Sequence, residues 1–221
     1  MDLSAEQIRD VLINVLTLVV SVALHEFGHA FVADRLGDDT PRRQGRLTLN
    51  PVAHADPIGT LALPLIASFS GFGAFGWGKP VQVQPQQFTR RFSVATGNLM
   101  VAIAGPTMNL LLGTFIAIVH VALLANHVFD NGPLVGTYLA KAVYINYLLF
   151  FFNLVPVAPL DGGTVLQRFV PYRHRATVDK VMVYGPFIVL LVILPPLNKI
   201  FLVPARFLGE HVYQALGALF F

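Results

Sequence analysis

The sequence contains no cysteine, and charged residues are scarce. Without cysteine, neither disulfide bonds nor thiolate ligands are available, so any metal ion must be held by His, Asp or Glu. Only 12% of the 221 residues are charged, whereas 55% are hydrophobic and the mean hydropathy is +0.64. This composition is too apolar for an ordinary soluble domain. We therefore predict an integral, multi-pass protein of the cell membrane, surrounded by the lipid bilayer.

Basic residues are absent from a long central stretch, since no Lys or Arg occurs between Arg91 and Lys141. Elsewhere they gather in short polar segments, which is typical of topology control and of contact with lipid headgroups. Nucleic acid is therefore not an expected partner. Four arginines follow the first apolar stretch and one precedes it, so the positive-inside rule places the chain start outside and residues 37–50 in the cytoplasm. No apolar stretch is followed by a small-residue cleavage site, so we expect no removable signal peptide.

The apolar stretches predict an all-α polytopic membrane protein, with spanning helices at about 6–36, 93–125, 134–154 and 181–194. The tail at 197–221 is either a last span or an interfacial helix. Because there are no repeats or linkers, residues 1–221 form a single predicted domain, with a core at about 6–165 and C-terminal helices at 176–221.

Residues 57–78 are apolar but interrupted by proline and glycine. Basic residues flank them on both sides, which favours cytoplasmic placement of both ends. We therefore predict a re-entrant segment that does not cross the membrane. Alternating residues nearby predict short strands at 46–49 and 79–84.

A metal-binding motif closes the first apolar stretch: His25-Glu26-Phe27-Gly28-His29. Positions i and i+4 share one face of a helix, so His25 and His29 can bind one zinc ion with a third ligand and an open position. Glu26 is placed to act as general base toward a water molecule there. A shuffled chain of this composition would contain the motif only roughly 0.3% of the time, which argues against coincidence.

Three aspartates are candidates for the third ligand: Asp34, Asp56 and Asp161. If 57–78 does not span, the third predicted helix returns inward, so Asp161 reaches the depth of the two histidines. Asp161 also lies where prolines break the helix, beside two glycines, so its carboxylate can approach an ion. The alternative is that Asp161 only caps the following short helix.

Together with a second motif, the first one resembles the site-2 protease family of intramembrane zinc metallopeptidases. The second motif is Asn153-Leu154-Val155-Pro156-Val157-Ala158-Pro159-Leu160-Asp161-Gly162, similar to the family pattern N-x-x-P-x-P-x-x-D-G. Ala158 occupies the place where the pattern has its second proline, and Pro159 follows one residue late. The segment Ala104-Gly105-Pro106 with Asn109 also resembles the family, and so does the segment 50–60. The resemblance covers roughly residues 20–165.

The resemblance implies three core helices around one zinc ion per chain, held by His25, His29 and Asp161, with Glu26 as the base. It implies regulated intramembrane proteolysis, in which single-span membrane proteins are cleaved in or near their transmembrane segments on the cytoplasmic side. No gap between the core helices has room for the PDZ domain that many relatives carry. For Asn153 the resemblance implies substrate binding or oxyanion stabilisation. The alternative for Asn153 is an interhelical hydrogen bond or a helix cap.

Other polar residues are harder to assign. We interpret Asn109 as a helix-packing residue. We expect His54 and Asp56 near the mouth of the zinc cavity, where His54 would line the water path, although Asp56 could simply cap the segment that Pro57 opens. Residues 79–84 and 153–161 could pair with an extended substrate through free backbone groups.

Two rival functions use the same residues. A membrane metal-binding or transport protein would need the His and Asp cluster but not Glu26. A catalytically silent, interaction-type relative would need no complete motif set, and the complete set argues against it.

Overall fold

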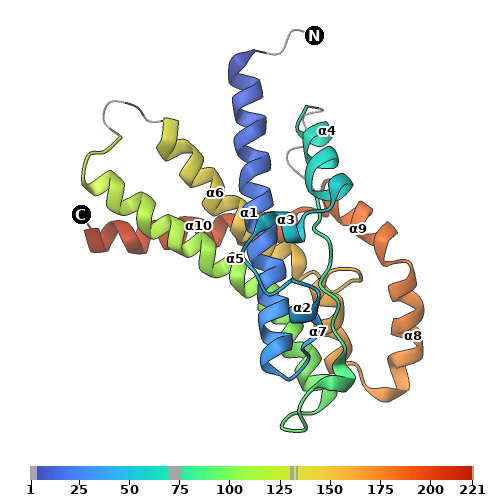
Figure 1. The fold of residues 1–221 in the computed structure, drawn as a ribbon. Helices are drawn as coiled ribbons and strands as arrows, with labels where there is room; N and C mark the ends of the chain where they lie inside the picture. Colours follow the sequence, from blue (N-terminus) through green and yellow to red (C-terminus); the bar gives the residue numbers. More distant parts are fainter. Residues whose placement is uncertain (1–3, 70–75, 130–131, 133, 221) are drawn as a thin grey trace.

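The computed structural model describes residues 4–69, 76–129, 132 and 134–220 (Figure 1). Its three longest helices before the C-terminal region are α1 (Ala5–Arg35), α5 (Val94–Ala125) and α6 (Leu134–Asn153). Between α1 and α5 lie α2 (Thr40–Arg43), α3 (Pro51–His54), the π-helix η1 (Pro57–Ala62), α4 (Leu63–Phe69) and the 3-10 helix η2 (Pro85–Gln87). After α6 come α7 (Asp161–Phe169), α8 (Tyr172–Val183), α9 (Gly185–Ile193) and α10 (Lys199–Phe220).

The prediction of an all-α polytopic membrane protein is confirmed. Among the described residues, three helices are long and apolar enough to cross a membrane, and these are α1, α5 and α6. The bounds of α5 and α6 agree with the predicted spans to within one residue at each end.

The predicted short strands are wrong, because the described part of the chain contains no strand. Residues 79–84 are extended, but their N–H groups do not meet a neighbouring strand. Val81 N donates to Glu26 Oε2, and Gln84 N donates to Asp38 Oδ2. Residues 46–49 are irregular, with a bend at 47–48, and the Arg46 guanidinium donates to the carbonyls of Ala53 and Lys79.

Helix α1 begins with a capping box, in which Ser4 Oγ accepts from Gln7 N and Gln7 Oε1 accepts from Ser4 N. It crosses α5 at a point where Gly28 has no room for a side chain. A Cβ on Gly28 would lie 2.6 Å from Met108 Cγ and 2.7 Å from the Ala104 carbonyl oxygen. This small residue lets the two backbones approach closely, as in other membrane helix pairs.

The break after α6 brings Asp161 back to α1. The chain turns through residues 154–160, which contain Pro156 and Pro159, and resumes as α7 at Asp161. A Cβ on Gly163 would lie 2.8 Å from Ala158 N, and one on Gly162 would collide with the carbonyls of the turn. The two glycines therefore let the start of α7 fold against this turn while α7 packs on α5.

The segment predicted to re-enter forms a hairpin whose two ends lie together. Trp77 N donates to the Gly59 carbonyl (3.0 Å) and Lys79 N donates to the His54 carbonyl (2.9 Å). In Figure 1 the segment rises as α4 beside α1, and the chain then returns toward η2. Its apolar helix, Pro57–Ala67, is too short to cross a bilayer. The tip of the hairpin, at 70–75, lies outside the described residues.

The C-terminal helices differ in part from the predicted ones. The apolar stretch 181–194 is divided between α8 and α9, which are bent by 64° relative to each other. Helix α10 packs along α5 and α6. Phe201 makes an edge-to-face contact with Phe152 at the end of α6, and Tyr213 contacts His120 toward the far end of α5. Helix α10 is not among the described helices that are apolar enough to cross a membrane, so only this packing favours a last span over an interfacial helix for the tail.

Candidate metal centre

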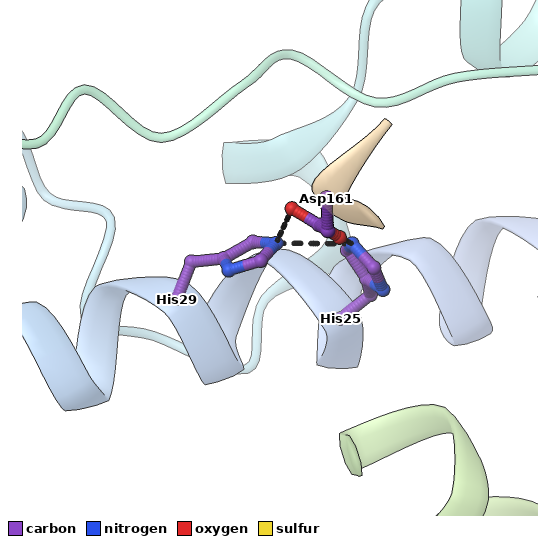
Figure 2. Close-up of side chains that lie close together, drawn as sticks. All are labelled: His25, His29 and Asp161. Atoms are coloured by element: carbon purple, nitrogen blue, oxygen red, sulfur yellow. Dashed lines mark hydrogen bonds and ion pairs between the residues drawn. The ribbon is translucent and has the colours of Figure 1, made fainter. Parts of the chain in front are cut away.

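Three ligand-type side chains converge between α1 and α7. His25 and His29 lie one turn apart on α1, and Asp161 opens α7 (Figure 2). The two Nε2 atoms are 3.0 Å apart. His25 Nε2 lies 3.1 Å from Asp161 Oδ2, and His29 Nε2 lies 3.3 Å from Asp161 Oδ1. One donor atom from each residue fits within 4.8 Å of the others, so the structure brings the three predicted ligands together.

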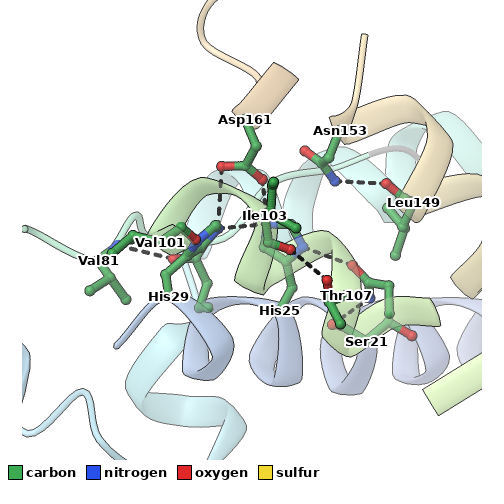
Figure 3. Close-up of polar contacts among 12 residues, drawn as sticks. Ser21, His25, His29, Val81, Val101, Ile103, Thr107, Leu149, Asn153 and Asp161 are labelled. Carbon is green, nitrogen blue, oxygen red and sulfur yellow. Dashed lines mark hydrogen bonds and ion pairs between the residues drawn. The ribbon is translucent and has the colours of Figure 1, made fainter. Parts of the chain in front are cut away.

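The other ring nitrogens of the two histidines are held by oxygen acceptors. His25 Nδ1 is 2.7 Å from Asn109 Oδ1, and His29 Nδ1 is 2.8 Å from the Val101 carbonyl oxygen (Figure 3). Since a carbonyl oxygen can only accept, each neutral imidazole carries its hydrogen on Nδ1. Both Nε2 lone pairs therefore point toward Asp161, which is the arrangement of histidine ligands in protein metal sites.

This donor set fits a zinc ion. Two imidazole lone pairs and a carboxylate repel one another at these distances unless a cation lies among them or one imidazole takes up a proton. Asp161 Oδ2 is buried and makes no hydrogen bond with a described residue, which leaves it available as a ligand. Two imidazoles and one carboxylate are a common protein ligand set for catalytic zinc, with a further position left open.

Glu26 lies beside these residues and lines the same cavity. Its Oε2 accepts a 2.9 Å hydrogen bond from Val81 N, so the extended segment 79–84 fixes the carboxylate against the cavity wall. The second oxygen, Oε1, has no protein donor among the described residues. It is therefore free to accept a hydrogen bond from water.

The cavity has a volume of about 870 Å³, which lies within the range of substrate-binding sites. Its polar lining includes His25, His29 and Asp161. Apolar side chains make up much of the rest of the lining. The returning arm of the hairpin contributes Trp77 and Val81, the end of α6 contributes Leu149 and Phe152, and α9 contributes Val189 and Leu190. The chamber can accommodate an apolar peptide segment next to the three ligand-type side chains.

Asn153, at the end of α6, also lines the cavity. Its Nδ2 donates to the Leu149 carbonyl (3.0 Å), and Figure 3 shows the side chain close to Asp161. The hydrogen bond is local to α6 and uses one of two Nδ2 hydrogens. The other hydrogen remains for a ligand, so both interpretations of Asn153 are compatible with its position.

His54 and Asp56 are not among the residues that line the cavity. His54 is 1% exposed, and its Nε2 contacts the Thr48 carbonyl oxygen at 2.9 Å. Asp56 caps η1 by accepting from Ile58 N and Gly59 N. The geometry therefore gives the expected cavity roles no support and favours the structural alternative. Asp34, the remaining carboxylate candidate, pairs with Arg42 at 2.7 Å.

Sequence reasoning missed the position of Asn109. It is fully buried on α5 and contacts His25 directly, although the sequence favoured a packing role. The available signal was a carboxamide in the middle of a mostly apolar spanning helix, four residues after Gly105.

Comparisons with known proteins find peptidases and zinc metalloproteases. A family profile described as Peptidase family M50 matches residues 121–194, which include Asn153 and Asp161. The chain is 36% identical over 214 residues to "Putative zinc metalloprotease YwhC" of Bacillus subtilis, covering 93% of this chain and 91% of that one. It is 33% identical over 187 residues to "Putative zinc metalloprotease Rip2" of Mycolicibacterium smegmatis, with coverage of 83% and 67%. For "Zinc metalloprotease MJ0392" of Methanocaldococcus jannaschii the identity is 29%, with coverage of 71% and 34%. No solved structure matches the chain.

Proposed function

Because the chain belongs to peptidase family M50, the site-2 protease family, and is a zinc-dependent metalloprotease of the membrane, we propose that it performs regulated intramembrane proteolysis. Its substrates would be single-span membrane proteins, cleaved in or near their transmembrane segments. The observation that carries this proposal is the placement of a complete protease donor set, with Glu26, in an apolar cavity beside a membrane-spanning helix.

Each site residue has a separate task in this proposal. His25, His29 and Asp161 would hold the zinc ion. When bound, zinc lowers the pKa of a coordinated water and polarises the scissile carbonyl. Glu26 accepts the water proton at Oε1 and later delivers it to the leaving amine, while Val81 N keeps the carboxylate in place. The free Nδ2 hydrogen of Asn153 would donate to the developing oxyanion.

The substrate must be unwound, because the carbonyls of a helix are engaged in hydrogen bonds. The structure limits how segment 79–84 could bind it. The N–H groups of Lys79, Val81 and Gln84 already donate to protein acceptors, and Pro80 has none. We therefore propose that the unwound substrate is held mainly by apolar contacts within the cavity, and that a continuous β-ladder along 79–84 does not form.

The proposed orientation places the active site toward the cytoplasm. The end of α1 that carries His25 and His29 is followed by three arginines in the α2 region, Arg42, Arg43 and Arg46. The positive-inside rule puts these arginines in the cytoplasm. Cleavage would then release the cytoplasmic part of a substrate.

The test uses purified protein in liposomes with a panel of single-span membrane proteins, each compared with a soluble peptide of the same sequence. We expect wild type to cleave at least one membrane-embedded substrate. Glu26→Ala should retain zinc but lose activity by at least about two orders of magnitude. Zinc uptake into the liposomes without cleavage would instead indicate a metal carrier. Equal cleavage by wild type and Glu26→Ala would exclude Glu26 as the base.

A further inference from the structure

We propose that Asn109, held in turn by Asn146, is a positioning residue that fixes the tautomer and orientation of His25 for zinc binding. This inference rests on the proposed role of His25 as a ligand. The contact that motivates it is the 2.7 Å approach of Asn109 Oδ1 to His25 Nδ1, between α5 and α1. Asn109 and Asn146 are both 0% exposed, so neither carboxamide is solvated by bulk water.

The direction of this hydrogen bond follows from the other contacts of the asparagine. Asn109 Nδ2 lies 3.0 Å from the Ser21 carbonyl oxygen and 3.3 Å from Asn146 Oδ1. Both partners are acceptors, so the amide nitrogen of Asn109 faces them and its oxygen faces His25. His25 Nδ1 must then be the donor, and its Nε2 lone pair is left for the metal.

Asn146 fixes its neighbour in the same way. Its Nδ2 donates to the Ala142 carbonyl on its own helix α6 (2.9 Å), so its Oδ1 is the atom turned toward Asn109. The hydrogen bonds therefore run in one direction, from His25 to Asn109, from Asn109 to Asn146, and from Asn146 to α6. Reversing the Asn109 amide would set two donors against each other at His25 and break the contacts to Ser21 and Asn146.

The two ligand histidines are thus held by different means. His29 Nδ1 donates to a backbone carbonyl, that of Val101, which no substitution of a side chain removes. His25 depends on a side chain carried by α5. Burying two carboxamides among apolar helices is costly unless every donor and acceptor is used, and here the contacts also join α1, α5 and α6 at the depth of the metal site.

A purely structural interpretation makes a different prediction. If the asparagines only hold the helices together, removing another α5–α6 hydrogen bond should have the same effect. The chain provides this control, because Thr114 Oγ1 lies 3.1 Å from Tyr147 OH across the same helix pair and away from the ligands. Thr114→Val removes that contact with little change in volume.

The experiment measures zinc affinity by chelator competition in wild type and in the Asn109→Leu, Asn109→Asp, Asn146→Leu and Thr114→Val variants. We expect Asn109→Leu to weaken zinc binding by about 10- to 100-fold, a usual effect of losing the hydrogen-bond partner of a histidine ligand. Asn109→Asp retains an acceptor for Nδ1, but its second oxygen meets the acceptors of Ser21 and Asn146, so its loss of affinity should be smaller than that of Asn109→Leu without reaching wild type. Asn146→Leu should also lie between Asn109→Leu and wild type, and Thr114→Val should stay within about twofold of wild type.

A second readout needs neither zinc nor activity. Nitrogen-15 NMR of histidine in the metal-free protein should show His25 protonated at Nδ1 in wild type and Thr114→Val, and a mixture of tautomers in Asn109→Leu. Wild-type affinity and tautomer in a folded Asn109→Leu protein would overturn the proposal, as would equal losses in Asn109→Leu and Thr114→Val. If Asn109→Leu does not fold, Asn146→Leu decides by the same two measurements. Failure of wild type itself to bind zinc would instead count against the proposed function.

Discussion

At the residue scale, the metal centre depends on a position without a side chain. Gly105 on α5 backs the two imidazoles, and a Cβ there would lie 2.7 Å from His25 Nε2 and closer still to His29 Nε2. Both rings are fixed at Nδ1, so they cannot withdraw without breaking those hydrogen bonds.

We predict that Gly105→Ala displaces the imidazoles and weakens zinc binding by at least about tenfold, measured by chelator competition. Gly217→Ala on α10 is the matched control, because a Cβ there meets nothing within 4 Å. It should bind zinc like wild type. Unchanged affinity in Gly105→Ala would mean that the histidines do not use the space beside Gly105.

The sequence identified the residues whose chemistry follows from spacing. His25 and His29 were predictable because i and i+4 share a helix face, and Asp161 because topology returned it to their depth. Asn109 and His54 were not, because their roles depend on which atoms meet across elements far apart in the chain. An asparagine in a mostly apolar helix gives no sign of which neighbour its amide faces, and the sequence does not show that His54 is buried against the Thr48 carbonyl.

At the scale of elements, the hairpin between α3 and η2 shapes one wall of the cavity. Its two arms are joined by the backbone hydrogen bonds of Trp77 and Lys79. A segment that enters and leaves at one level keeps Val81 beside Glu26, whereas a crossing segment would carry it to the opposite side of the membrane.

We predict that the hairpin does not cross. Single cysteines introduced at Gln44 and Gln86, on its two sides, should react with an impermeant thiol reagent from the same side of the membrane. The native chain has no cysteine, so there is no background labelling. Asn126→Cys, in the turn after α5, should react from the opposite side and serves as the control. Labelling of Gln44→Cys and Gln86→Cys from opposite sides would end the re-entrant interpretation.

Helix α10 gives a second topological prediction. It is not among the described helices that are apolar enough to cross a membrane. It nevertheless starts near Phe152 at the end of α6 and reaches His120, five residues before α5 ends, and from this packing we predict that it crosses. Ala218→Cys should then be labelled from the same side as Asn126→Cys. Labelling of Ala218→Cys with Gln44→Cys instead would make α10 an interfacial helix.

The long helices were predictable because apolar length fixes a spanning helix. The strands predicted at 46–49 and 79–84 failed because alternation shows only that a segment is extended. The polar groups of 79–84 found side chains such as Glu26 and Asp38 as partners, which the sequence pattern does not specify. The break between α8 and α9 lies just before Gly185-Pro186, a pair that interrupts the apolar run and that the prediction of one span overlooked.

At the scale of the whole molecule, the metal site is assembled by packing that does not need the ion. Close contact of α1 with α5 through Gly28, and the buried apolar clusters that join α5, α6 and α10, hold the ligands in position. This differs from small zinc domains, whose folding depends on the metal.

We therefore predict that a chelator abolishes cleavage without unfolding the protein. Helix content by circular dichroism should remain unchanged, and Tm should fall by only a few degrees, since bound zinc stabilises the fold only through its own affinity. Adding zinc back should restore activity. Collapse of the helical signal on chelation would show that the ion holds the fold together.

The proposed chemistry requires one zinc ion bound by His25, His29 and Asp161. X-ray absorption at the zinc edge tests this binding most directly. Purified wild type should contain one zinc per chain, with two imidazole nitrogens at about 2.0–2.1 Å and oxygen ligands at similar distance. Asp161→Ala should lose most of its zinc or change its oxygen shell. Absence of bound zinc in wild type, or an Asp161→Ala protein with unchanged zinc affinity and spectrum, would contradict zinc binding by these three residues.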